Sequence, residues 1–304
     1  MGEKSKKRGE FGEDIVESLL NMIGWKTVFT GHDFECIRPI EHSISTKERS
    51  SHGVDFIYKY DCPLFNNRQQ FVLVSSKYND EYLSNPTNKL KSHLADIANT
   101  LECFKKSSLR NKLISFGKEY NYTGVIFWLD NGAKYDDLFE RLTDFRVDDD
   151  LDFDSVYLVD NKRADFLYKT IMFADNFFAD KKIEFLIPNT GYNNTMKARK
   201  TSTLILPVQY INSSVLPFKV IQRQMTEILV LNVIDSFEEE YLKRLISLAQ
   251  KLTEGWGNEV FILFPEYNKD KYEDIVKRVK LEFQDQSFVS KIKVETFNPD
   301  FRNV

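Results

Sequence analysis

The sequence has little of what builds fibrous, low-complexity or membrane-spanning proteins. Of its 304 residues only 12 are Gly and 8 are Pro, which excludes collagen-like and low-complexity chains. No stretch approaches the roughly 18 consecutive apolar residues of a membrane helix. The basic N-terminus also lacks the apolar segment of a secretory signal. We therefore expect a cytoplasmic protein that makes no use of a membrane.

Cysteine and histidine are scarce as well. The cysteines are Cys36, Cys62 and Cys103, and the histidines are His32, His42, His52 and His93. No two cysteines form a CxxC pair, and an odd, scattered set indicates no disulfide framework. The histidines do not show the short spacing of known zinc motifs either. On this basis a tetrahedral Cys/His zinc site is not expected.

What the chain does have is material for a large core. Hydrophobic residues make up 42% of the sequence, and the aromatics include 25 Phe and 14 Tyr. The length fits one large domain or two of ordinary size. The formal net charge is −4, so the chain is no polycation. Any contact with nucleic acid must come from a local basic patch.

The first part of the chain alternates helices and strands, which indicates α/β architecture. Periodicity and turn residues predict a helix over 10–23 that ends at Gly24, strands over 25–30, 54–60 and 70–76, a helix over 86–108 and a strand over 124–130. The strands over 54–60 and 70–76 are expected to form a hairpin. The polar stretch from His42 to His52 predicts an exposed loop.

The second part continues the alternation. The pattern predicts helices over 134–143, 162–178, 237–253 and 269–284, and strands over 155–159, 183–187, 203–209, 217–221, 228–234, 260–264 and 291–297. A polar segment over 191–202 suggests a boundary near residue 195, giving domains 1–195 and 196–304. The C-terminal domain is expected to be a smaller α/β unit with a parallel sheet. It has no GxGxxG and no P-loop, so an accessory, oligomerisation or partner-docking role is the default.

One constellation of residues carries chemistry. Asp55 lies early in one predicted strand, and Lys77 lies near the end of the next. Adjacent strands are about 4.8 Å apart, so the two side chains can flank a common point. Glu13 lies at the edge of the apolar arc of the first helix, from where its carboxylate can turn into a cleft. An Asp and a Lys on a strand pair can also form a simple structural ion pair.

This arrangement resembles the PD-(D/E)xK nuclease superfamily, whose members include many restriction enzymes and Holliday-junction resolvases. The core of that family runs helix, three-stranded meander, helix, strand, and residues 10–130 repeat this order. The segment RGEFGEDIVESLLNMIGW is similar to the family's first helix and carries Glu13. HGVDF supplies Asp55, and Ser75-Ser76-Lys77 occupies the place of the last motif. The resemblance implies a restriction-endonuclease-like mixed sheet flanked by helices.

The resemblance also implies roles for these residues. Glu13, Asp55 and the backbone carbonyl of Ser76 would hold Mg²⁺ or Mn²⁺. Lys77 would orient the attacking water or neutralise charge in the transition state. Lys89 and Lys91, near the start of the long helix, would contact the nucleic-acid backbone, although an ordinary polar helix face is the favoured interpretation of these lysines.

One position departs from the family pattern. Ser75 stands where the family usually has Asp or Glu, and serine brings no charge to a metal ion. A carboxylate from elsewhere could replace it, with Glu35, Asp80 and Glu81 as candidates, or the site could be inactive.

The resemblance therefore predicts a metal-dependent endonuclease, with DNA as the favoured substrate and RNA, including tRNA, as the alternative. The layout of a nuclease domain joined to an α/β module resembles the nuclease subunit of two-gene, GAPS-type bacterial anti-phage defence systems. That likeness implies a partner protein subunit, and a homodimer is the other arrangement considered. A second interpretation, based on Ser75, is a catalytically impaired subunit that binds nucleic acid or acts as a scaffold.

Overall fold

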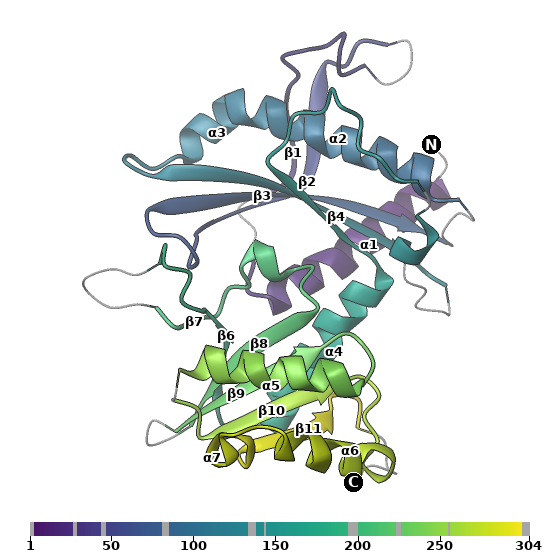
Figure 1. The fold of residues 1–304 in the computed structure, drawn as a ribbon. Helices are drawn as coiled ribbons and strands as arrows, with labels where there is room; N and C mark the ends of the chain where they lie inside the picture. Colours follow the sequence, from purple (N-terminus) through teal and green to yellow (C-terminus); the bar gives the residue numbers. More distant parts are fainter. Residues whose placement is uncertain are drawn as a thin grey trace. The chain divides into compact units, whose positions relative to one another are not determined.

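The computed structural model describes residues 3–26, 29–43, 47–80, 85–132, 138–142, 144–193, 200–222, 226–254 and 256–299. The chain divides into two compact units (Figure 1). Unit 1 comprises Met1–Asp165 with Pro207–Asn212, and unit 2 comprises Phe166–Leu206 with Ser213–Val304. This division differs from a boundary near residue 195, because the strand at 182–186 pairs within the sheet of unit 2.

Unit 1 is built on a five-stranded sheet. Its strands are β1 (Phe29–Glu35), β2 (Ser51–Asp61), β3 (Arg68–Asn79), β4 (Glu119–Asp130) and β5 (Ser155–Val159), in the order β1-β2-β3-β4-β5. The first three form an antiparallel meander, and β4 and β5 run parallel to β3. The predicted hairpin and the order of elements are confirmed.

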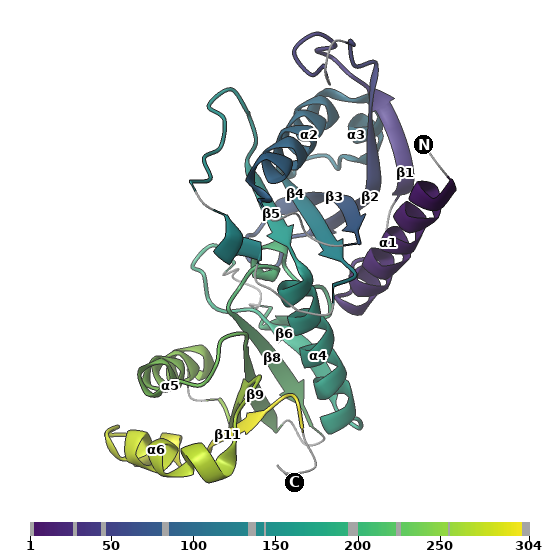
Figure 2. The same cartoon turned by 90° about the vertical axis from the view of Figure 1, so that its right-hand side faces the viewer.

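Two long helices cover opposite faces of this sheet, as Figure 2 shows: α1 (Glu3–Met22) and α2 (Thr87–Lys106). Helix α1 stops as predicted at Gly24, whose φ of 80° is left-handed. The N–H of Trp25 reaches back to the carbonyl of Leu20 at 2.8 Å, the bond of a Schellman cap. Helix α2 lies close to β4 at Gly124, where a Cβ would come within 2.8 Å of the Ile97 side chain.

The core of unit 1 lies between α2 and the sheet and is rich in aromatic residues. The described residues of this unit also form the short helix α3 (Ser108–Leu113) and the 3-10 turns η1 (Leu138–Arg141) and η2 (Val208–Tyr210). The helix predicted over 134–143 is therefore only the single turn η1 among the described residues, since 133–137 and 143 lie outside them. The carboxylate of Asp160, a residue distant in sequence, accepts the N–H of Leu138 at 3.0 Å and so fixes the start of the turn.

Unit 2 contains a six-stranded mixed sheet in the order β11-β10-β9-β8-β6-β7. Its strands are β6 (Lys182–Leu186), β7 (Ser202–Thr203), β8 (Val215–Ile221), β9 (Glu227–Val233), β10 (Glu259–Phe264) and β11 (Ile292–Thr296). The predicted parallel sheet is confirmed for β9, β10 and β11, whereas β6 and β8 are antiparallel. The link from β8 to β9 is too short for the crossover that a parallel pair requires.

The described residues of unit 2 form the helices α4 (Asn161–Phe177), whose first residues belong to unit 1, α5 (Glu239–Thr253), α6 (Lys269–Leu281) and α7 (Gln286–Val289). Helices α5 and α6 pack on the face of β10 that carries Val260, Ile262 and Phe264. The alternate residue Phe261 contacts Phe177 and Phe178, at the end of α4, on the other face. None of the helices in the described ranges is long and apolar enough to cross a membrane.

Candidate active site

The carboxylate of Asp55 joins β2 to β3 at the point where their regular pairing ends. The register runs from Asp61 opposite Gln69 to Phe56 opposite Val74, and Asp55 is the next residue along β2. Its Oδ2 atom accepts the backbone N–H of Ser76 at 2.6 Å. This bond holds one carboxylate oxygen against β3, one residue before Lys77.

Helix α1 crosses β3 one residue beyond Lys77. A Cβ on Gly12 would lie 2.4 Å from the Cβ of Tyr78, so only glycine permits this approach. The ring of Phe11 meets Tyr78 edge-on, with 5.5 Å between ring centroids. Arg8 forms an ion pair of 2.5 Å with Asp80 at the end of β3. These contacts fix the position of the residue that follows Gly12, which is Glu13.

Glu13, Asp55 and Lys77 act on one another electrostatically. Burial raises the pKa of Glu13, and the negative charge of Asp55 raises it further, while Lys77 opposes the shift. Burial also raises the pKa of Asp55, against the lowering effects of the Ser76 N–H and of Lys77. The Glu13 side chain is exposed to solvent, so the effect of the nearby Asp55 charge, rather than burial, identifies it as a candidate site residue. Two carboxylates thus share the influence of one ammonium group, an arrangement that favours an added cation.

Ser75 brings no charge to this cluster, and the candidate replacements differ in where they lie. Glu35 is at the far end of β1, opposite Ser51. Asp80 is engaged by Arg8. Glu81 lies outside the described residues. Neither Glu35 nor Asp80 therefore supplies a third carboxylate to Asp55.

Asp96 of α2 is the acidic residue that sequence reasoning missed. Its charge raises the pKa of Asp55, so it lies within electrostatic range of the cluster. It also pairs with Arg49 at 2.6 Å, so part of its charge is already balanced. The sequence does contain a signal for Asp96. Lys89, His93 and Asp96 are spaced i, i+4 and i+7, which places all three on one face of the predicted helix.

His93 is a second residue of α2 within electrostatic range of the cluster. It is buried, its ring stands edge-on to Trp128 at 5.1 Å, and its Nε2 atom has no hydrogen-bond partner among the described residues. Burial, together with the positive charges of Lys77 and Lys89, lowers its pKa to about 4. The ring is therefore neutral at physiological pH, and it lies near Lys77.

The two lysines expected to contact nucleic acid differ in their surroundings. Lys89 is exposed and close enough to His93 to influence its pKa. Lys91 instead forms an ion pair of 3.2 Å with Asp148. The structure thus brings Lys89, but not Lys91, toward the candidate site.

The element order of unit 1 is that of a PD-(D/E)xK nuclease. A family model described as the GAPS4 protein PD-(D/E)XK nuclease domain matches residues 1–163, and the chain belongs to that family. The matched range ends close to the boundary of unit 1 at Asp165. Nucleases of this superfamily use divalent metal ions, and a nuclease domain binds nucleic acid. No curated protein and no solved structure matches the chain.

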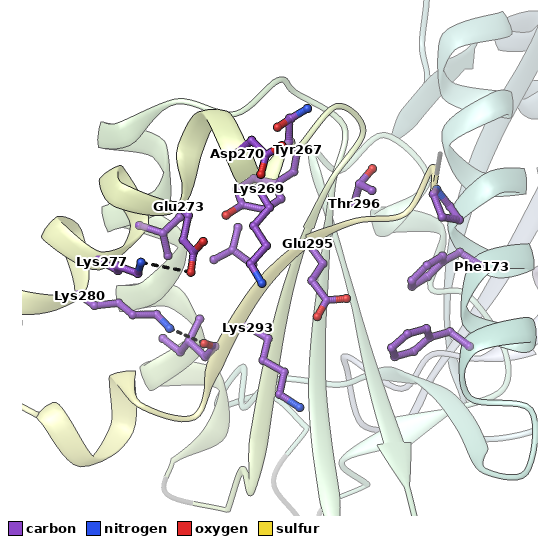
Figure 3. A pocket seen from close by; sticks show the side chains of 16 residues that line it. Phe173, Tyr267, Lys269, Asp270, Glu273, Lys277, Lys280, Lys293, Glu295 and Thr296 are labelled. Carbon is purple, nitrogen blue, oxygen red and sulfur yellow. Dashed lines mark hydrogen bonds and ion pairs between the residues drawn. The ribbon is translucent and has the colours of Figure 1, made fainter. Parts of the chain in front are cut away.

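Unit 2 has a hollow of its own, with a volume of about 730 Å³. Figure 3 shows lysines and acidic residues side by side around it, mainly on α6 and β11, with Phe173 of α4 on the opposite wall. Lys277 pairs with Glu273 at 3.3 Å, and the ammonium of Lys280 donates to the carbonyl of Ile292. The mixed charge of this lining selects no class of ligand.

Proposed function

We propose that the chain is a Mg²⁺- or Mn²⁺-dependent endonuclease that hydrolyses phosphodiester bonds. The observation that carries this proposal is the Asp55 carboxylate held at Ser76 N–H, with Glu13 and Lys77 in electrostatic contact. DNA is the favoured substrate, and RNA, including tRNA, is the alternative. In keeping with the family, we infer a cytoplasmic role in bacterial anti-phage defence.

The donor set fits a hard divalent cation. Glu13 and Asp55 offer carboxylate oxygens, and the backbone of Ser76 offers a carbonyl oxygen, which are the ligands that Mg²⁺ and Mn²⁺ prefer. The raised pKa of each carboxylate fits the same purpose, because burial, and for Glu13 also the charge of Asp55, disfavours the ionised form, and a bound cation would offset both effects. When bound, such an ion would activate water and stabilise negative charge on the phosphate.

The residues of the chain supply the remaining steps. The Ser76 N–H orients the Asp55 carboxylate by holding its Oδ2 atom. No hydrogen bond or ion pair engages the Lys77 ammonium within the described ranges, so it is available to orient the water or to neutralise charge in the transition state. Lys89 extends the positive charge along α2, where the phosphate backbone of a substrate would lie.

A cleavage assay on the purified chain tests the activity and names the substrate class. Supercoiled plasmid, linear duplex and total tRNA are each incubated with Mg²⁺, Mn²⁺ or EDTA. We expect metal-dependent cleavage of one class and a loss of at least about a hundredfold in Lys77→Ala. The matched control is Lys118→Ala, whose lysine pairs with Asp61 at 3.6 Å, at the other end of β2 from Asp55. Cleavage that is equal in both variants would refute the assignment.

A catalytically impaired subunit is the second candidate, and Ser75 is the observation that favours it. That candidate predicts nucleic-acid binding that EDTA does not change and no cleavage with any metal. Calorimetric binding of Mn²⁺ to the wild type that is absent in Asp55→Asn would count against it.

We further propose that unit 2 serves as an accessory region that docks a partner protein subunit or a second copy of the chain. Full cleavage by the isolated monomer would show that neither is required. Restoration of cleavage by a co-purifying protein would identify the partner-dependent arrangement.

A further inference from the structure

Four buried side chains of unit 1 meet at a point that the nuclease chemistry does not use. Cys36 follows β1, His42 lies in the connection to β2, His52 lies in β2, and Cys103 lies in α2. One potential ligand atom from each lies within 4.8 Å of all the others. All four residues are at least nine-tenths buried. Two thiols and two imidazoles that meet in the interior of a protein need partners that compensate for their burial.

Four of the six distances between these atoms are close to the edges of a tetrahedral zinc site, and the other two are at most 4.8 Å. The Nδ1 atom of His42 lies 3.4 Å from the Sγ atoms of Cys36 and of Cys103, and 3.3 Å from Nε2 of His52. The two sulfur atoms are 4.0 Å apart. Around Zn²⁺, bonds of about 2.3 Å to sulfur and about 2.0 Å to nitrogen give edges of about 3.8 Å for S···S, about 3.5 Å for S···N and about 3.3 Å for N···N.

The outer nitrogen of each histidine is held by a hydrogen-bond acceptor. His42 Nε2 lies 3.2 Å from the carboxylate of Glu102, and His52 Nδ1 lies 3.2 Å from the hydroxyl oxygen of Thr100. That hydroxyl donates its own proton to the carbonyl of Asp96 at 2.7 Å, so it accepts from His52. Each ring therefore carries its proton on the outside and directs a lone pair inward.

Without a cation, this arrangement places the two inward lone pairs 3.3 Å apart and facing each other. A metal ion between them removes that repulsion and uses both sulfur atoms as well. The N–H of Ile37 points at the sulfur of Cys103 at 3.5 Å, a contact that supports a thiolate. The two sulfur atoms are 4.0 Å apart, far longer than a disulfide bond, so Cys36 and Cys103 are not disulfide-bonded in this structure.

We propose that Cys36, His42, His52 and Cys103 bind a structural Zn²⁺ ion. Two thiolates and two neutral imidazoles in tetrahedral array are the ligands of closed zinc sites, and four protein ligands leave no position for a substrate. The ion ties the connection between β1 and β2 to α2. Helix α2 also carries His93 and Asp96, so the zinc ion fixes the position of a helix that lies within electrostatic range of the candidate active site.

This proposal departs from the expectation that no tetrahedral Cys/His site is present. The expected exposed loop over 42–52 is confirmed at Ser43, Lys47, Glu48 and Ser50, but not at its two ends. His42 and His52, the two ends of that stretch, are buried in the cluster. The spacing does not reveal the site, because the ligands come from a strand end, a connection, a strand and a distant helix. Zinc motifs that can be read from sequence bring two ligands from one short turn.

Metal analysis of the untagged, full-length wild type tests this proposal without any assay of cleavage. The protein is passed over a chelating resin to remove loosely bound metal and is then purified by gel filtration. Elemental analysis is expected to find about one zinc per chain. A mercurial reagent that modifies thiols should release that zinc to a colorimetric indicator. Replacement by Co²⁺ should give the visible absorption of a tetrahedral ion with thiolate ligands. Wild type that contains no zinc after growth in zinc-supplemented medium would overturn the proposal, as would a Cys36–Cys103 disulfide found by mass spectrometry under non-reducing conditions.

Variants of single residues test which side chains bind the ion. Cys103→Ser is expected to lose the zinc and to lower the melting temperature, whereas Cys62→Ser should keep the zinc, because Cys62 is equally buried but lies outside the cluster. His42→Ala should behave like Cys103→Ser, and His32→Ala like the wild type. If Cys103→Ser fails to fold, release of zinc from the wild type by the mercurial still decides the question. Full zinc content in soluble Cys103→Ser would contradict the assignment of ligands.

Discussion

The backbone of Gly12 in α1 lies directly against Tyr78 of β3, so closely that a Cβ on Gly12 would stand 2.4 Å from the Cβ of Tyr78. The neighbours of these two residues are Glu13 and Lys77. The contact therefore sets the approach of a carboxylate on a helix to an ammonium on a strand. Because the close atom on Tyr78 is its Cβ, no rotation of the tyrosine side chain relieves the overlap.

Substitution of Gly12 should consequently impair cleavage. Gly12→Ala must move α1 away from β3 and take Glu13 with it. We expect a clear loss of activity without the usual gain in stability. Gly9→Ala is the matched control, since nothing lies within 4 Å of its added Cβ. This control should raise the free energy of unfolding by about 0.5–1 kcal/mol, as alanine does in helices, and keep full activity. Equal behaviour of the two variants in denaturation and cleavage assays would disprove this role of Gly12.

The electrostatics of Asp55 and Glu13 predict how pH and metal affect stability. Both carboxylates have a raised pKa in the folded chain, so the folded state binds protons more tightly than the unfolded state. Their contribution to the free energy of unfolding is therefore most favourable at acid pH and falls as pH rises through their titration range. Mn²⁺ should reverse that loss, and its stabilising effect should be larger at neutral than at acid pH.

Asp55→Asn provides the control for this prediction. The amide oxygen can still accept the Ser76 N–H, but the negative charge is gone. In the absence of added metal, the variant should be at least as stable as the wild type at neutral pH. It should show little increase in melting temperature with Mn²⁺. A thermal shift with Mn²⁺ as large as that of the wild type would show that the ion binds elsewhere.

The contrast between Lys89 and Lys91 predicts different effects on nucleic-acid binding. Lys89→Ala should weaken binding and lower the salt dependence, by about 0.9 in the slope of log K against log salt for each phosphate that the protein no longer neutralises. Lys91→Ala should change the slope little, because Lys91 is paired with Asp148. Binding isotherms over a series of salt concentrations, in EDTA to prevent cleavage, measure both. A larger effect of Lys91→Ala would reverse this interpretation of α2.

The sequence predicts the core of unit 1 well because local signals agree there with the tertiary structure. Apolar periodicity indicates α1 and α2, Gly24 ends α1 with a left-handed φ, and the continuous apolar run predicts β4, which is covered on both faces. The association of Asp55 with the Ser75–Lys77 segment also follows from strand adjacency. Each of these features depends on residues that are close in sequence or on neighbouring strands.

Features that depend on distant parts of the chain were not predictable in the same way. The cluster of Cys36, His42, His52 and Cys103 forms only when α2 packs on the sheet. Asp96 comes within electrostatic range of Asp55 for the same reason. The division between the units was misplaced because the pairing of β6 with β8 leaves no local mark in the composition of the chain.

The most direct test of the central claim compares cleavage by the wild type and by Asp55→Asn, each with Mn²⁺ and with EDTA, on whichever of plasmid, linear duplex and tRNA the wild type cleaves. Asp61→Asn, at the opposite end of β2, serves as the control for loss of an aspartate. The account predicts cleavage by the wild type and by Asp61→Asn with Mn²⁺ only, and no detectable cleavage by Asp55→Asn in either condition. Cleavage by Asp55→Asn at the wild-type rate, or undiminished cleavage by the wild type in EDTA, would contradict it.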